Sequence, residues 1–210
     1  MVVQRRYNPE GKSRLNIVPG LLAVILTMTM VMMTALAVTR ERERGTMENL
    51  LAMPVRPIEV MIGKIAPYIV IGTVQVMVVL AAAKLLFAVP FEGSILLFGA
   101  ATVLFITVNL AVGFTFSTIA RNQLQAVQMS FFFLMPAILL SGFAFPFRGM
   151  PGWAQVIGEA LPATHFIRIV RGVMLKGASL DQVAGEIAVL AFMLVIVATV
   201  AVSRYKVTLD

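Results

Sequence analysis

Long stretches without a charged residue constrain this chain more than any other feature. One holds 25 residues between Arg14 and Arg40, and another holds 28 residues between Glu92 and Arg121. A helix of about 20 apolar residues is long enough to cross a bilayer. Hydrophobic residues make up 60% of the chain and charged residues 13%, proportions that lie outside the range of soluble domains. The sequence therefore predicts an all-α integral membrane protein.

Five membrane-spanning helices are predicted within a membrane domain at residues 17–210, which follows a polar tail at residues 1–16. Pro67 predicts a bend in the second span. Pro136, in the middle of the fourth span, predicts either a simple kink or a gate. Asn109 in the third span is either a polar contact between helices or a residue of a transport pathway. The predicted spans are residues 17–38, 65–83, 94–120, 123–145 and 182–203.

A charged segment, residues 40–64, separates the first two spans. It holds five of the seventeen basic residues and four of the ten acidic ones, a near balance that indicates a structured surface and not a polybasic lipid anchor. Within it, residues 46–53 are predicted to form a short amphipathic helix. The segment is either an ordinary connection between spans or a docking element for a soluble partner. The helix signals are a candidate N-cap, an apolar stripe at i, i+3 and i+4, and a terminating proline: Thr46, Met47, Leu50, Leu51 and Pro54.

Signals for helix ends recur along the chain. Pro57 and Glu59 suit the first turn of the second spanning helix, where a missing N–H costs nothing and the dipole favours a carboxylate. Gly177 is placed as a C-terminal cap. Ser179 and Gln182 form a capping box that predicts the start of the last span.

A hairpin, residues 150–176, precedes the last span. Its two pieces, 150–161 and 162–176, are too short and too charged to cross a bilayer. The second piece has an apolar stripe with helical spacing, which predicts an interfacial or re-entrant hairpin. Trp153 is a candidate interfacial anchor, and His165 is either structural or has a proton-sensing or substrate role. The stripe consists of Phe166, Ile169, Val170, Val173 and Met174, with Arg168 and Arg171 off it.

Several function classes are excluded by what the chain lacks. It has no cysteine and one histidine, so no catalytic residue, metal site or cofactor site is predicted, and it carries no phosphate loop. The net charge is +7, but the basic residues are not interleaved with aromatic ones, which argues against nucleic-acid binding and favours lipid headgroups. An ion-coupled transporter would need ionisable groups in the middle of the spans, where this chain has none.

Several motifs occur together in a recognisable order. The charged segment lies within RERERGTMENLLAMPVRPIEVMIGKIAPY, and the other motifs are YNPE, VPG, FFFLMP, LSGFAFPF, MPGW and RGVMLKG. This set resembles the ABC-2 type permeases, which are the membrane subunits of bacterial ABC exporters. The resemblance covers most of the chain.

The resemblance implies that residues 46–53 form a cytoplasmic coupling helix on a separate ATPase subunit, which binds the ATP. It also implies a second permease subunit, identical or different, a periplasmic adaptor as a further candidate partner, and a multi-pass location in the bacterial inner membrane. The hairpin would lie on the outer side and narrow the exit. The residues implied in coupling are Arg42, Glu43, Gly45, Thr46, Glu48, Leu50, Leu51 and Pro54, and those implied in the exit hairpin are Trp153, Pro162, Arg168 and Arg171.

The distribution of basic residues alone does not determine the orientation of the chain in the membrane. The side of the charged segment collects eight basic residues and the opposite side nine. By the resemblance, YNPE ends an extracytoplasmic domain that follows an earlier span, so the chain is interpreted as a permease without its N-terminal part, either a fragment or a product with a misassigned start. Without the four basic residues of the tail the counts are eight and five, which places the charged segment in the cytoplasm. The alternatives are an ion-coupled transporter and a non-transporting membrane scaffold.

Overall fold

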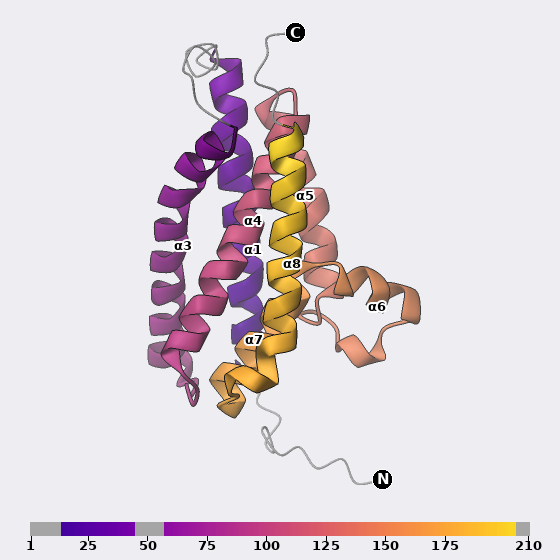
Figure 1. Cartoon of the computed structure of the whole chain (residues 1–210). Coiled ribbons are helices and arrows are strands. Elements are labelled where there is room, and N and C mark those ends of the chain that lie inside the picture. Colours follow the sequence, from indigo (N-terminus) through magenta and orange to yellow (C-terminus); the bar gives the residue numbers. More distant parts are fainter. Residues whose placement is uncertain (1–13, 45–56, 205–210) are drawn as a thin grey trace.

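The computed structural model describes residues 14–44 and 57–204, and within these ranges every regular element is a helix (Figure 1). Five of the helices are long and apolar enough to cross a membrane. The predicted all-α membrane fold with five spans is therefore confirmed. The elements are α1 (Arg14–Glu43), α3 (Pro57–Phe87), α4 (Ile95–Ile119), α5 (Gln123–Leu140), the 3₁₀ turn η1 (Phe147–Gly149), α6 (Gly152–Glu159), α7 (Pro162–Lys176) and α8 (Leu180–Arg204).

Helix α4 lies at the centre of the bundle and contacts α1, α3, α5, α7 and α8. Its contact with α1 depends on a glycine, because a Cβ atom at Gly113 would lie 2.3 Å from the carbonyl oxygen of Val31. Small residues allow helix backbones to approach closely in membranes, where packing replaces the hydrophobic effect as the force between helices. α1 and α4 therefore pack backbone against backbone.

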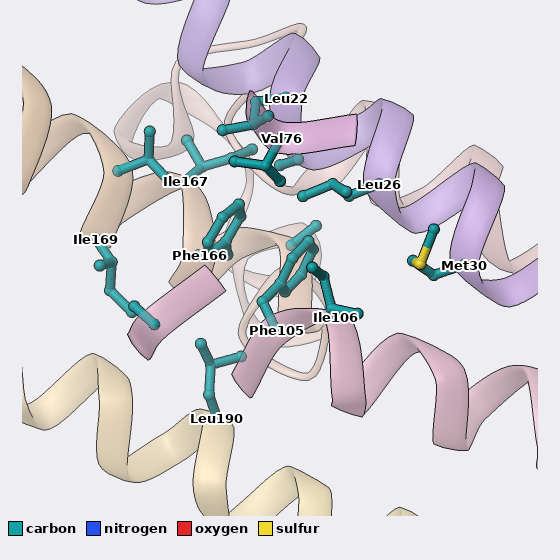
Figure 2. Close-up of a cluster of buried hydrophobic side chains, with 14 of the residues drawn as sticks. Leu22, Leu26, Met30, Val76, Phe105, Ile106, Phe166, Ile167, Ile169 and Leu190 are labelled. Atoms are coloured by element: carbon teal, nitrogen blue, oxygen red, sulfur yellow. The ribbon is translucent and has the colours of Figure 1, made fainter. Parts of the chain in front are cut away.

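The apolar core lies where α7 enters the bundle (Figure 2). The rings of Phe105 on α4 and Phe166 on α7 stack with centroids 4.0 Å apart and an interplanar angle of 3°. Both side chains are fully buried, together with Leu22 and Leu26 of α1 and Leu190 of α8. The same buried cluster includes residues of all five spans, so this core joins the hairpin to the whole bundle.

Several helix ends differ from the predicted spans. α1 continues through Glu43 because arginine and glutamate favour helix and extend it beyond the apolar stretch. α3 begins at Pro57, since proline and an acidic residue suit the first turn of a helix. The fourth span was predicted to reach residue 145, and this was wrong, because α5 ends at Leu140. The chain turns there through Gly142, whose φ of +84° lies in the left-handed region that favours glycine.

The predicted end signals fit the observed helices. Pro57 opens α3 with Glu59 in its first turn. Gly177 ends α7 in the left-handed conformation, with φ of 60°, and α8 begins directly after Ser179. α3 and α5 run through Pro67 and Pro136 without interruption.

Within the described residues, the Asn109 side chain makes no hydrogen bond to another helix, which was one of its two interpretations. Its Nδ2 donates to the carbonyl oxygen of Phe105 at 2.8 Å, one turn earlier in α4. Its Oδ1 is buried without a hydrogen-bond partner among the described residues. The role of Asn109 in a pathway stays a prediction.

The two ends of the bundle have different architectures. At one end the described chain leaves α1, re-enters at α3, turns from α4 into α5 and finishes α8 (Figure 1). At the opposite end lie the start of α1, the turn between α3 and α4, and α7, while α6 stands to the side of the bundle (Figure 1). We refer to these as the loop end and the hairpin end.

Candidate functional site

At the loop end, the last residue of α1 binds the start of α5. The carboxylate of Glu43 accepts a hydrogen bond from the backbone N–H of Gln123 at 2.7 Å and another from the Gln123 side-chain amide. These two hydrogen bonds lower the pKa of Glu43. A carboxylate at a helix N-terminus is also stabilised by the helix dipole. Glu43 thus connects two spans that are 80 residues apart in the sequence.

A second polar contact at the loop end joins α1 to α3. The ammonium of Lys64 pairs with the carboxylate of Glu41. The side chain of Lys64 is 14% exposed and that of Glu41 is 36% exposed, so the pair is partly shielded from water. The ends of three spans are therefore linked around the charged segment.

Most of the residues implied in coupling fall outside this description. The predicted coupling helix at 46–53 lies outside the described residues, and so do Gly45, Thr46, Glu48, Leu50, Leu51 and Pro54. Arg42 is described only as part of the backbone of α1, and Glu43 is the one implied residue whose contacts are known. Their roles in coupling stay predictions.

At the hairpin end, α7 is buried far more deeply than a helix that lies on a membrane surface. Ten of its fifteen residues are buried, including the whole predicted stripe. Pro162 occupies the first turn of the helix, and Phe166 stacks on α4. Trp153 on α6 is 66% exposed, as an interfacial anchor would be. The hairpin thus has one buried arm and one exposed arm.

Arg168 connects the two arms of the hairpin and the last span. It donates to the carboxylate of Glu159 on α6 at 2.5 and 3.0 Å and to that of Glu186 on α8 at 3.4 Å. Its guanidinium also lies 4.6 Å from the centroid of the Phe147 ring, a cation–π distance. The hydrogen bond from Arg168 lowers the pKa of Glu159, and the same bond raises the pKa of Arg168.

Arg171 faces the turn after α5. It donates to the carbonyl oxygen of Gly142 at 3.2 Å. Burial lowers the pKa of Arg171, because removal of water disfavours the charged form. Both arginines implied in the exit hairpin thus hold other elements of the hairpin end against α7.

His165 lies beside Arg168 and is almost completely buried. Its Nδ1 is 2.5 Å from a carboxylate oxygen of Glu186, and its Nε2 is 2.8 Å from the carbonyl oxygen of Glu159. The histidine therefore contacts both α8 and the end of α6. Among the described residues, no group of three or more histidine, aspartate or glutamate side chains is arranged to hold a metal ion.

Sequence reasoning did not identify Gln123, Lys64, Glu159 or Glu186 as site residues. Their partners lie on other helices, so local spacing carries no signal for three of them. Glu186 did have a signal, because it is the one charged residue between Asp181 and Arg204 in an otherwise uncharged helix. A charge within an apolar helix usually has a partner or a function.

The chain is similar to known proteins over most of its length. The family profile described as "ABC-2 type transporter" matches residues 3–175. A protein of Escherichia coli K12 named "Probable multidrug ABC transporter permease YbhR" is 38% identical over 205 residues, which cover 98% of this chain and 55% of that protein. "Inner membrane transport permease YhhJ" of the same organism is 33% identical over 193 residues, covering 90% of this chain and 52% of that protein.

A more distant relative comes from a eukaryote. "ABC transporter G family member 20" of Dictyostelium discoideum is 30% identical over 173 residues, covering 82% of this chain and 24% of that protein. The chain spans about half the length of the bacterial relatives it matches. No solved structure matches it.

Proposed function

The chain belongs to the ABC-2 type transporter family, and from this premise we propose that it is the membrane subunit of an ATP-driven exporter. Family membership over residues 3–175 is the observation that carries the proposal. The five spans supply the membrane path, and the names of the bacterial relatives describe permeases.

The energy for transport comes from a separate ATPase subunit. The permease then needs no cofactor and performs no covalent chemistry, because the partner binds and hydrolyses the ATP. We propose that two permease subunits, identical or different, assemble with two ATPase subunits, and a periplasmic adaptor is a further candidate partner. Movement of the ATPases would push on residues 46–53 and shift the spans between inward-facing and outward-facing states.

The polar contacts at the loop end support a route for this movement. The charged segment, residues 40–64, includes the end of α1 and the start of α3. Glu43 binds Gln123 at the start of α5, and Lys64 of α3 pairs with Glu41 of α1. A displacement of the charged segment would therefore act on three spans together. The exporter interpretation requires the loop end to face the cytoplasm and the hairpin end to face outward, in the inner membrane of a bacterium.

Co-purification with the ABC ATPase encoded beside the permease gene tests the proposal. The wild-type chain in lipid should bind the ATPase and change its rate of ATP hydrolysis. Glu48→Arg should release the ATPase, because it reverses a charge in the coupling helix. Glu92→Arg is the matched control, since Glu92 is an exposed carboxylate in the turn at the opposite end of the bundle, and it should leave binding intact.

Two outcomes would contradict the proposal. Failure of the wild-type chain to bind the ATPase would favour a non-transporting membrane scaffold. Equal loss of binding in Glu48→Arg and Glu92→Arg would show that the charged segment is not the docking element.

A further inference from the structure

Both ring nitrogens of the single histidine of the chain face oxygen atoms. His165 lies in the first turns of α7, and its side chain is 4% exposed. Its two ring nitrogens face different helices, α8 through Glu186 and α6 through Glu159. The number of protons in this contact depends on which of these atoms can donate a hydrogen bond.

The Nε2 atom must carry a hydrogen. Its partner at 2.8 Å is the backbone carbonyl oxygen of Glu159, and a carbonyl oxygen only accepts. A neutral imidazole has one N–H, so in the neutral form of His165 that hydrogen is on Nε2 and Nδ1 has a lone pair.

The Nδ1 atom then requires a second proton. Its partner at 2.5 Å is a carboxylate oxygen of Glu186, and an ionised carboxylate only accepts. A neutral imidazole and an ionised carboxylate would direct two lone pairs at each other across this distance. One additional proton removes the conflict, either on Nδ1 or on the carboxyl of Glu186.

The neighbouring charges indicate where that proton resides. Arg168 donates to both Glu159 and Glu186, which favours ionised carboxylates. With His165 protonated, the cluster has two positive and two negative groups and is electrically neutral. Without the proton it has a net negative charge beside an imidazole that is only 4% exposed, and removal of water disfavours an unbalanced charge there.

Other helices near His165 do not alter this balance. α4 and α5 contain no charged residue, and the charged side chains described on α1, namely Arg40, Glu41 and Glu43, lie at the loop end. On α7 itself, Arg171 binds the carbonyl oxygen of Gly142 and Lys176 is in the last turn. On α8, the remaining acidic group at this end is Asp181 in the first turn.

We propose that His165 and Glu186 form a proton-binding site that joins the hairpin to the last span. The bound proton makes Nδ1–H a donor to Glu186 while Nε2–H donates to the carbonyl oxygen of Glu159. Loss of the proton replaces one hydrogen bond by two facing acceptors, so the contact between α7 and α8 weakens as pH rises. On the proposed orientation this site would lie on the outer side of the membrane.

Nuclear magnetic resonance of the full chain in lipid, labelled with ¹⁵N-histidine, tests the site directly. The spectrum contains one imidazole because the chain has one histidine. Both ring nitrogens should be protonated at pH 7, or should share a strongly hydrogen-bonded proton with the carboxyl of Glu186. A neutral ring with its hydrogen on Nδ1, or a neutral ring with a free Nδ1 lone pair, would overturn the proposal.

Glu186→Gln is the matched variant. The glutamine amide can donate to Nδ1 of a neutral imidazole, so it preserves the contact without the extra proton. His165 in this variant should be neutral at pH 7, with its hydrogen on Nε2. If the histidine titrates identically in the wild type and in Glu186→Gln, the shared proton does not exist.

A distance measurement between α6 and α8 tests whether the contact between the hairpin and the last span weakens as pH rises. The chain has no cysteine, so spin labels can be attached through Val156→Cys on α6 and Ala188→Cys on α8, both exposed positions. The distance distribution should broaden as pH rises above 7 and the shared proton is lost, and Glu186→Gln should abolish the change. An equal response in both proteins would refute the link. Neither measurement requires the ATPase, so their outcome is independent of the exporter proposal.

Discussion

The two ends of the bundle are held together by different kinds of contact. The loop end uses polar groups near water, with Glu43 fully exposed and Glu41 about one-third exposed. The hairpin end uses a buried aromatic stack and a charged cluster around His165, which is almost completely enclosed. Charged contacts near water contribute little and are screened by salt. A buried aromatic contact is costly to remove because a cavity remains, and a buried charge is costly to leave without its partner.

This difference indicates a division of labour. Weak, exposed contacts can rearrange under a small force, as the proposed coupling to an ATPase requires of the loop end. Strong, buried contacts fix α7 relative to α1, α4 and α8. The hairpin end should therefore keep its shape while the loop end adjusts. Three experiments test this contrast, from the largest expected effect to the smallest.

The largest effect should come from the aromatic core at the hairpin end. Phe166→Ala should lower the free energy of unfolding by about 3–5 kcal/mol, because it leaves a cavity beside Phe105. Chemical unfolding of the purified chain in detergent measures this. Trp153→Ala in the exposed arm is the control and should change stability little, since the Trp153 side chain is 66% exposed. Similar losses in the two variants would show that α7 is not the structural anchor.

A smaller effect is expected from acid at the same end. Arg168 lowers the pKa of Glu159 below its ordinary value of 4.5, so the stability contributed by this pair is fully present above pH 4.5. It is lost as pH falls through the lower folded-state value. The loss should stay below about 1 kcal/mol because the carboxylate is half-exposed. Unfolding from pH 6 downwards should show an acid step in the wild type that Glu159→Gln lacks.

This acid step has the opposite sign to the proposed proton effect at His165. Acid removes the charge of Glu159 and loosens its bond to Arg168, whereas alkali removes the proton between His165 and Glu186. The contacts at the hairpin end should therefore be most stable at intermediate pH. A steady rise in stability towards alkaline pH would contradict the pairing at His165.

The smallest effect should come from the loop end. A double-mutant cycle with Glu41→Gln and Lys64→Met, which remove the charges without reversing them, should give a coupling energy of about 0.2–1 kcal/mol. High salt should shrink that energy because it screens charges near water. The cost of Phe166→Ala should not shrink over the same salt range. A coupling energy that does not change with salt would mean that the Glu41–Lys64 pair is shielded from water, which would contradict the contrast between the two ends.

The sequence predicted the helices better than the contacts between them. Apolar stretches flanked by charges gave the five spans, and Gly177 correctly ended α7. The end of α5 was missed because residues 141–145 are mostly apolar, and hydropathy does not register the left-handed turn at Gly142. The bond from Gln123 to Glu43 could not be found, since no local pattern relates residues 80 apart.

The depth of α7 was also hidden in the sequence. Its two arginines and its histidine are typical of a helix that lies at a water boundary. Tertiary contacts overrode that pattern, because Glu159, Glu186 and the Gly142 carbonyl oxygen supply partners for all three side chains. Those partners come from α6, α8 and the turn after α5, so the sequence of α7 alone does not predict them.

The close fit of Gly113 against Val31 bears on how the subunit can change shape. Two helices whose main chains are in contact cannot slide past each other without steric clash, so α1 and α4 should move as one rigid unit. Helices α3 and α8 present broad apolar faces outward, through residues such as Val70 and Phe192, and have fewer constraints. A conformational change of this bundle should therefore move α3 and α8 relative to a fixed pair of α1 and α4.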